Sequence, residues 1–187
     1  MSKLKWKPGT MIYPLPPVMV SCGDMENSNI LTIAWTGIVC TEPATTYVSI
    51  RKERFSYDII KSSGKFVINL ASSNLAKAVD YCGVSSGRNI DKFKECNLTK
   101  ELGPETKCPM IKECPINIEC QVKEIKELGS HDMFIAEILS VNVDEKYLDS
   151  TGRFDMQACD LLAYCHGQYY SLGNRLGKFG FSVEKKK

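Results

Sequence analysis

The alternation of apolar and polar side chains along the chain predicts a mainly β protein. Residues 116–126 and 134–144 are long alternating segments, and residues 128–132 between them are typical of a short antiparallel hairpin connection. Shorter stretches rich in β-branched and aromatic residues predict four further strands: 18–22, 30–37, 45–51 and 66–70.

Two segments between the early strands have the end signals of helices. Ser56 is placed to cap the N-terminus of one helix, and Gly64 lies just beyond its expected end. Asn74 is placed to cap a second helix that runs through about residue 81, with Gly83 as its stop. Residues 91–94 predict one further helical turn.

Many strands joined by short turns, with helices inserted between the early strands, are typical of a closed antiparallel barrel. We therefore expect a mainly β (α+β) fold in which a single domain spans residues 1–187. No internal repeat or low-complexity linker marks a boundary, and the charged residues 184–187 are expected to form a solvated tail.

Composition excludes two broad classes of partner. The chain has 187 residues with 43% hydrophobic and 25% charged side chains, which is enough apolar material for a sizeable core. The 24 Lys and Arg against 22 Asp and Glu leave a net charge of only +2, which argues against general nucleic-acid binding. No apolar run approaches the roughly 18 residues that a membrane-spanning helix needs. A local cation cluster for a small anion remains compatible with this balance.

The nine cysteines are expected to be reduced and mostly buried. The N-terminus lacks the apolar region of a signal peptide, which indicates a cytoplasmic protein whose thiols stay free. No C-x-x-C occurs, so the usual zinc and thioredoxin-like signals are absent and no metal site is predicted. Cys114 and Cys120 fall on the apolar face of the alternating segment, as core residues do.

A candidate phosphate site lies where the strand 45–51 runs into the first predicted helix. The sequence 51–54 places Arg51, Lys52 and Arg54 just before the Ser56 cap. A helix N-terminus has unpaired N–H groups and a positive dipole end, which together favour a phosphate. The strand 30–37, with small and hydroxyl side chains on one face, would let a planar ligand approach the backbone. A basic surface turn with an ordinary helix cap would have the same local sequence.

Two other motifs have equally ordinary interpretations. The Gly- and Ser-rich residues 85–89 precede a helical turn, but they match neither the P-loop nor the dinucleotide-binding pattern. A plain loop with a solvated Arg88 is as consistent with them as a phosphate cradle. Cys165 and His166 are adjacent, and neighbours in a strand point to opposite faces, so we discount them as a nucleophilic dyad.

An ordered set of short motifs from about residue 13 to residue 181 resembles one known family. The motifs are Tyr13-Pro-Leu-Pro-Pro-Val, Asn29-Ile-Leu-Thr-Ile-Ala-Trp-Thr-Gly37, Val48-Ser-Ile-Arg51, Ser56-Tyr-Asp58, Phe66-Val-Ile-Asn-Leu70, Asp91-Lys-Phe93, Gly129-Ser-His131 and Phe134-Ile-Ala-Glu137. In this order they resemble the flavin-reductase-like FMN-binding split barrels, and within them the flavoredoxin branch.

The resemblance implies a six-stranded antiparallel split β-barrel with helical insertions. It further implies a homodimer with one FMN per subunit near the interface. The implied FMN contacts are Thr32, Ile33, Ala34, Trp35 and Thr36 in one strand, Ser49, Ile50 and Arg51 in the next, Ser56 and Tyr57 at the phosphate with Lys52 or Arg54 assisting, and also Lys92 and Tyr170.

His131 is one of only two histidines in the chain. A histidine in a turn is commonly a surface or hydrogen-bonding residue. The resemblance instead places it near the flavin face that nicotinamide approaches, as a contact for nicotinamide or substrate. The family's usual Gly-Asp-His is here Gly129-Ser130-His131, so a carboxylate before the histidine is missing.

Together these features predict an oxidoreductase that transfers electrons through bound FMN. FMN carries hydride and single-electron chemistry, while the protein binds, orients and tunes it. The electron donor is either NAD(P)H, as in flavin reductases, or a redox protein partner, as in an electron relay. A non-catalytic module that stores or senses FMN, or a site for another phosphorylated ligand, fits the same residues.

Overall fold

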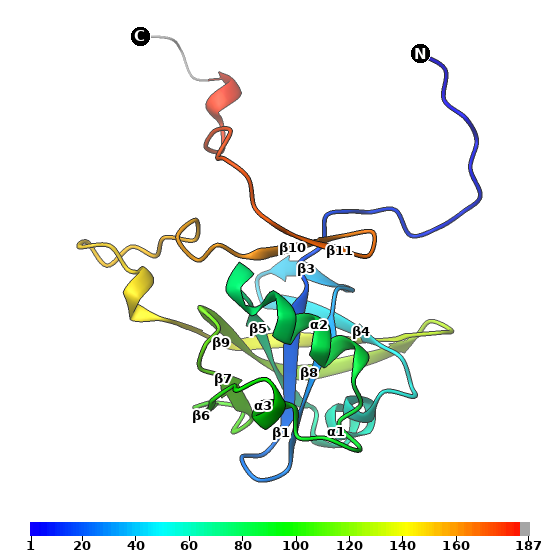
Figure 1. Ribbon diagram of the computed structural model, residues 1–187, viewed down its shortest axis with the longest axis vertical. Coiled ribbons are helices and arrows are strands. Elements are labelled where there is room, and N and C mark those ends of the chain that lie inside the picture. Colours follow the sequence, from blue (N-terminus) through cyan, green and yellow to red (C-terminus); the bar gives the residue numbers. More distant parts are fainter. Residues whose placement is uncertain (184–187) are drawn as a thin grey trace.

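Within residues 1–183, which the computed structural model describes, seven antiparallel strands form the main sheet (Figure 1). They are β1 (Val18–Gly23), β2 (Ser28–Ile33), β3 (Thr36–Thr41), β4 (Ala44–Ile50), β5 (Lys65–Leu70), β8 (Ile116–Glu127) and β9 (Asp132–Val143). Their order across the sheet is β2-β1-β5-β8-β9-β4-β3. The predicted tail at 184–187 lies outside the described residues.

The two edge strands of this sheet, β2 and β3, follow each other directly in the chain. Residues Ala34 and Trp35 carry the backbone from one edge to the other, and the Ser49 amide donates to the Trp35 carbonyl at 2.9 Å. The sheet therefore curls until its edges meet, as expected for a split barrel. The predicted single strand 30–37 is interrupted at this point, which is why the main sheet has seven strands where six were expected.

The interior of the barrel is a core to which strands from both halves of the sheet contribute. Val20 of β1, Leu31 of β2, Val48 of β4 and Phe134 of β9 are all buried in it. Thr46, Val48 and Ile50 are buried, and the residues between them in β4 are partly exposed, as a period of two requires.

A second core lies on the outer face of β1 and β2, beneath the helices. Met19 and Ile30 point outward from these strands and pack with Val79 and Cys82 of α2 (Ala76–Val84) and Phe93 of α3 (Lys92–Glu95). Both faces of β1 are thus buried, which explains its unbroken apolar run. The predicted turn at 91–94 is confirmed, and the Asp91 side chain caps α3 through the amides of residues 93 and 94.

The first helix, α1 (Phe55–Ser63), begins two residues earlier than a helix capped by Ser56 would. Its N-cap position is occupied by Arg54, without a side-chain cap, so the prediction that Ser56 caps it is wrong. Ser56 is instead buried within the first turn and accepts a hydrogen bond from Asn29 Nδ2 at 2.7 Å. The predicted stop is confirmed: Gly64 has φ 66° and its amide donates to the Ile60 carbonyl at 2.8 Å.

The second helix also differs at both ends from the prediction. A short 3₁₀ segment, η1 (Ser73–Leu75), precedes α2, and Asn74 Oδ1 accepts from Ser72 Oγ at 2.9 Å rather than capping the helix. Gly83 lies inside α2 and does not end it. A Cβ at Gly83 would be 3.3 Å from Thr32 Cβ, so the glycine allows α2 to pack closely on β2.

The long strands β8 and β9 form the predicted hairpin, and the first half of β8 is buried on both faces. Both Cys114 and Cys120 are buried, but Cys114 precedes β8 and packs in the second core, while Cys120 packs in the barrel core. Glu119, which neighbours Cys120 in β8, is also fully buried. The small sheet of β6 (Lys100–Leu102) and β7 (Pro109–Ile111) and the loop between them bring Thr106 to it. Glu119 Oε2 accepts from the Thr106 amide and hydroxyl, both at 2.7 Å.

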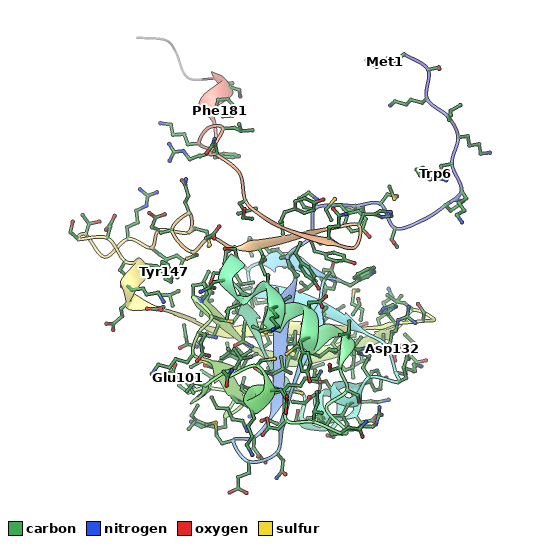
Figure 2. The ribbon with its side chains drawn as sticks, viewed as in Figure 1. Met1, Trp6, Glu101, Asp132, Tyr147 and Phe181 are labelled. Atoms are coloured by element: carbon green, nitrogen blue, oxygen red, sulfur yellow. The ribbon has the colours of Figure 1, made fainter. Side chains whose placement is uncertain are left out.

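The hairpin of β10 (Leu162–Cys165) and β11 (Gln168–Ser171) lies apart from the main sheet and closes one end of the molecule (Figure 1). It is attached through isolated bridges from Leu15 to Tyr164 and from Ser72 to Leu161. Short 3₁₀ segments η2 (Glu145–Tyr147) and η3 (Phe181–Val183) lie before and after it. Both terminal segments extend away from the barrel on this side (Figures 1 and 2).

All nine cysteines are unpaired, and six of them are buried, which confirms that most serve as core residues. Among residues 1–183, no helix is long and apolar enough to cross a membrane.

Candidate functional site

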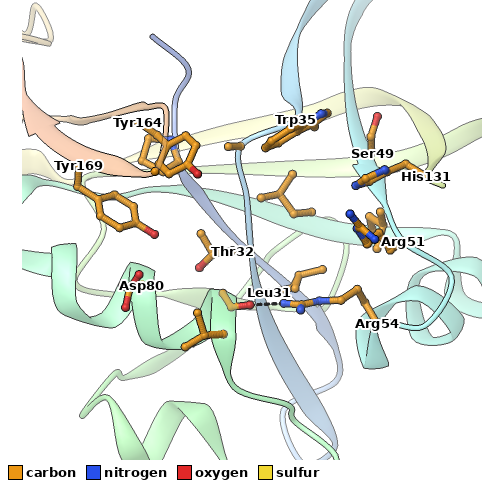
Figure 3. Close-up of a pocket in the computed structure, with 17 residues that line it drawn as sticks. Leu31, Thr32, Trp35, Ser49, Arg51, Arg54, Asp80, His131, Tyr164 and Tyr169 are labelled. Atoms are coloured by element: carbon orange, nitrogen blue, oxygen red, sulfur yellow. Dashed lines mark hydrogen bonds between the residues drawn. The ribbon is translucent and has the colours of Figure 1, made fainter. Parts of the chain in front are cut away.

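A pocket of about 350 Å³ opens between the β2–β3 link, the end of β4, α2 and the β10–β11 hairpin (Figure 3). This volume is within the range of small-molecule sites. The residues that line it, here called the large pocket, are Pro17, Leu31, Thr32, Ile33, Ala34, Trp35, Ser49, Ile50, Arg51, Arg54, Asp80, Gly83, Val84, His131, Tyr164, Gly167 and Tyr169.

The large pocket has cationic and anionic sides. Figure 3 shows Arg51, Arg54 and His131 on one side and Asp80 and Tyr169 on the other. Burial, followed by the charge of Arg51, lowers the pKa of His131, so its imidazole is neutral at pH 7. Burial, followed by the charge of Asp80 and a hydrogen bond to it, raises the pKa of Tyr169 to about 12. A ligand in the large pocket would therefore meet neutral hydrogen-bonding groups between the positive charges of the two arginines and the negative charge of Asp80.

A second pocket of about 190 Å³ lies beside the first, at the N-terminus of α1. The residues that line it, here called the cationic pocket, are Asn29, Leu31, Glu53, Arg54, Phe55, Ser56, Val84, Ser85, Ser86, Gly87, Arg88 and Lys92. Leu31, Arg54 and Val84 line both pockets, so the two are contiguous. Three cations and the first residues of a helix face this space, which is the composition of an anion site.

Lys92 is the most unusual of the cations because it is almost fully buried, at 3% exposure. Its ammonium group donates to the carbonyls of Ile30 at 2.7 Å and Cys82 at 2.8 Å. An ammonium has three donors, so one remains for a ligand. Burial lowers the pKa of Lys92 to about 8, and Lys92 is therefore still mostly charged at pH 7.

The loop that walls the cationic pocket is packed tightly against β2. A Cβ at Gly87 would lie 2.0 Å from Asn29 Oδ1, so only glycine fits there. Arg88 donates to the Glu53 carbonyl at 3.1 Å and stacks over Phe55, with 5.6 Å from its Cζ to the ring centroid. These contacts hold the Arg88 guanidinium over the N-terminus of α1.

Most residues predicted from the sequence come together around the two pockets. The large pocket contains Thr32, Ile33, Ala34, Trp35, Ser49, Ile50, Arg51, Arg54 and His131, and the cationic pocket contains Arg54, Ser56 and Lys92. The remaining predicted residues line neither pocket: Thr36, Lys52, Tyr57 and Tyr170.

Each of these four has other contacts in the fold. The Thr36 hydroxyl donates to the Tyr47 carbonyl at 2.6 Å. Tyr57 is buried and its hydroxyl donates to Asp132 at 2.6 Å, which raises the pKa of Tyr57 to about 12. Lys52 forms ion pairs with Glu127 at 3.3 Å and with Asp132 at 3.5 Å. Tyr170 donates to Gln168, and its neighbour Tyr169 lines the pocket because successive residues of β11 point to opposite faces.

Sequence reasoning missed Asp80, Tyr164, Tyr169 and Arg88 as lining residues. The first three come from α2 and from the β10–β11 hairpin, where the resemblance pointed to Tyr170 instead. Arg88 lies in the Gly- and Ser-rich loop. The position of this loop just before a helical turn was the sequence signal that could have identified Arg88 as a site residue. His166 lies in the β10–β11 turn with φ 49°, and its ring packs edge-on against Tyr13. Among residues 1–183, no group of three or more His, Cys, Asp or Glu residues is placed to hold a metal ion.

The fold of this chain is that of a known class of proteins. A model of the flavin reductase like domain matches residues 10–173. The chain belongs to the flavin-reductase-like family.

Similar proteins extend this assignment. The structure of the flavoredoxin of Desulfovibrio vulgaris (Miyazaki F) has 33% sequence identity and a TM-score of 0.90, over 98% of this chain and 100% of that one. Flavoredoxin from Methanosarcina acetivorans has 30% identity and a TM-score of 0.87, with coverage of 98% and 100%. An uncharacterized protein of Archaeoglobus fulgidus is 33% identical over 138 residues, which are 74% of this chain and 77% of that protein. Within the family, the chain is similar to the flavoredoxin branch.

Proposed function

We propose that the protein is a redox flavoprotein that binds FMN across the two contiguous pockets and transfers electrons through it. The isoalloxazine ring occupies the large pocket, and the phosphate occupies the cationic pocket. The observation that carries this proposal is the pairing of a chamber bordered by the β2–β3 link with an adjacent chamber that contains Arg54, Arg88 and Lys92. The resemblance of the chain to flavoredoxins supports FMN as the flavin.

The residues present fit each part of the cofactor. Ile33, Ala34 and Trp35 border the large pocket where the chain crosses between the sheet edges, and the small side chain of Ala34 allows a planar ring to approach the backbone. In the cationic pocket, the third donor of Lys92 and the first turn of α1 fit a phosphate. Asp80 lies in the large pocket, where its charge opposes entry of the phosphate in the reversed orientation.

Bound FMN supplies hydride and single-electron chemistry. The chain holds the reacting ring against the β2–β3 link, and the side chains of Trp35 and Tyr164 limit its contact with water. His131, neutral at pH 7, offers a hydrogen bond at the pocket without adding charge. We propose that it contacts the nicotinamide or substrate.

An absorption and binding experiment tests FMN as the ligand. The purified protein, stripped of flavin, is titrated with FMN and with riboflavin while flavin absorption and fluorescence are followed. We expect tighter binding of FMN, because only FMN carries the phosphate. Protein that gains no flavin signal from either compound would overturn the proposal. Equal affinity for both compounds would show that the phosphate does not bind in the cationic pocket.

The electron donor is either NAD(P)H or a reduced protein, and anaerobic bleaching separates the two. Loss of the oxidised flavin absorbance on adding NADH or NADPH identifies a flavin reductase. Bleaching by a reduced redox protein alone identifies an electron relay, which the similarity to flavoredoxins favours. Absence of bleaching by any reductant with a suitable potential would indicate FMN storage or sensing instead.

We further propose that the protein is a cytoplasmic homodimer. The terminal segments are extended and carry exposed apolar side chains, including Trp6 at 80% and Leu176 at 93% exposure (Figure 2). Ile38 on edge strand β3 is 87% exposed. A second copy would cover these side chains. Sedimentation equilibrium should give twice the mass of the chain, and a monomer at micromolar concentration would refute the assembly. The nine unpaired thiols fit a reducing compartment.

A further inference from the structure

Two thiols lie close together behind the cationic pocket. Cys82, in the last turn of α2, is fully buried, and Cys96, directly after α3, is half-buried. Their Sγ atoms are 3.9 Å apart. A disulfide requires about 2.05 Å, so side-chain rotation and a small backbone adjustment would bring the sulfurs together.

The two cysteines bracket one wall of the cationic pocket. Between them lie the loop residues 85–88 and the buried Lys92, all of which line that pocket. Lys92 is itself attached to the pair, because its ammonium donates to the carbonyl of Cys82. The backbone of Cys82 thus contacts the lysine that would hold the phosphate.

We propose that Cys82 and Cys96 form a redox modification site, which a hydroperoxide converts reversibly into an intramolecular disulfide that restrains the loop 85–88. A buried cysteine is ordinarily a small core residue. Here two cysteines lie close together on either side of the loop that lines the cationic pocket, and core packing alone does not require such a pair.

The chemistry balances with hydrogen peroxide as the oxidant. The Cys96 sulfur, which is the more accessible, attacks the peroxide, so that the S–O bond forms, the O–O bond breaks and one water leaves. The Cys82 sulfur then displaces the hydroxyl group from Cys96, which forms the S–S bond and releases a second water. Two thiols and one peroxide give one disulfide and two waters. Burial, followed by the nearby Cys96, raises the pKa of Cys82 to about 12, which disfavours Cys82 as the first thiol to react.

The consequence for ligand binding rests on the proposed function. A disulfide would tether the two ends of the pocket wall and reduce the entropy that the loop loses when a phosphate binds. We therefore expect oxidation to raise the affinity for FMN about threefold and to leave the affinity for riboflavin unchanged.

Peptide mapping tests the modification site without reference to FMN. The full-length protein is treated with equimolar hydrogen peroxide, and its peptides are analysed without reduction. We expect a mass loss of two hydrogens and a peptide cross-linked between residues 82 and 96, both reversed by dithiothreitol. Cys40→Ser, which removes the exposed cysteine, is the matched control and should leave the cross-link intact. Cys96→Ser should abolish it.

Three outcomes would overturn the proposal: oxidation of Cys96 to sulfinic acid without a cross-link, a cross-link between other cysteines, or an unreacted pair while Cys40 is oxidised. Because mapping is done on the wild-type chain, a variant that fails to fold does not affect the test. FMN and riboflavin titrations of reduced and cross-linked protein then test the consequence. A cross-link with equal affinities would refute control of the pocket, whereas no binding of either flavin would refute the proposed function alone.

Discussion

The imidazole of His131 lies parallel to the indole of Trp35, with 6.1 Å between ring centroids and 5° between ring planes (Figure 3). Trp35 belongs to the link between the two edges of the barrel, and His131 belongs to the β8–β9 hairpin. Both residues line the large pocket. The stacked pair therefore connects the point where the barrel closes to the position where we propose that the flavin ring binds.

This relationship predicts the effect of removing the indole. Trp35→Ala should weaken FMN and riboflavin equally, by about five- to tenfold, because a ring contact is worth about 1 kcal/mol and does not involve the phosphate. Fluorescence titration with both flavins measures the change. Tyr147→Ala, in the 3₁₀ segment η2 outside both pockets, is the control and should retain wild-type affinity. A loss confined to FMN would place Trp35 away from the ring.

A substitution of Arg88, unlike one of Trp35, should weaken the binding of FMN and not that of riboflavin. Arg88→Gln removes a guanidinium from the cationic pocket and should weaken FMN about tenfold, with little effect on riboflavin. Lys94→Gln removes the same charge nearby, from an exposed side chain paired with Asp91, and should change neither affinity. Similar losses in the two variants would mean that only the general charge of this region matters.

Lys92 gives the phosphate site a pH dependence. Its pKa is lowered to about 8 by burial, so it is charged below that pH and neutral above it. The affinity for FMN should therefore fall by up to about tenfold per pH unit between the pKa of the free protein and the higher pKa of the complex. A bound phosphate favours the charged lysine, so the decline begins near pH 8 and levels off at the higher pKa of the complex.

Titrations of FMN and riboflavin between pH 7 and pH 10 measure this effect. Riboflavin, which lacks the phosphate, should not follow the same decline, and the difference between the two ligands isolates Lys92. In Lys92→Met the FMN affinity should be lower at pH 7 and should lose this pH dependence. A wild-type FMN affinity that stays constant over this range would contradict the assignment.

Glu119 should contribute to the stability of the fold and not to the affinity for the ligand. Ser140 and Asn142 donate to its Oε1 at 2.8 and 3.1 Å, and Thr106 and the Glu105 amide donate to its Oε2. Glu119→Ala would leave these donors unsatisfied and should lower the free energy of unfolding by about 3 kcal/mol in urea titrations. Glu137→Ala, which breaks a surface ion pair with Lys123, should cost less than about 1 kcal/mol.

The same carboxylate predicts sensitivity to acid. Burial opposes its ionisation, but the hydrogen bonds from Thr106, Ser140 and Asn142 outweigh this and lower the pKa of Glu119 below 4.5. A lowered pKa stabilises the fold above pH 4.5, and this contribution disappears as the pH falls through the folded-state value. Between pH 6 and pH 3 the stability of Glu119→Ala should therefore fall less steeply than that of wild type. Parallel curves would show that Glu119 does not contribute to the acid sensitivity.

Much of the fold could be predicted because strand periodicity is a local property. The hairpin of β8 and β9, the buried face of β4 and the glycine stop of α1 all agree with the residue patterns. Helix starts agreed less well, because Ser56 and Asn74 have partners elsewhere, namely Asn29 and Ser72. A capping residue and a buried polar residue have the same identity in a sequence, and only packing distinguishes them.

The sequence by itself determined that the chain forms a β-rich protein with a basic turn before a helix, and its motif order indicated the flavin-reductase-like family. Only the tertiary structure decided which polar residues share a cavity. Tyr169 rather than Tyr170 lines the large pocket because the placement of β11 turns that face of the strand toward it. Lys92 reaches the cationic pocket from α3, 62 residues beyond its partner Ile30. Such choices depend on strand register and helix placement, which are set by contacts between distant segments and are not contained in local periodicity.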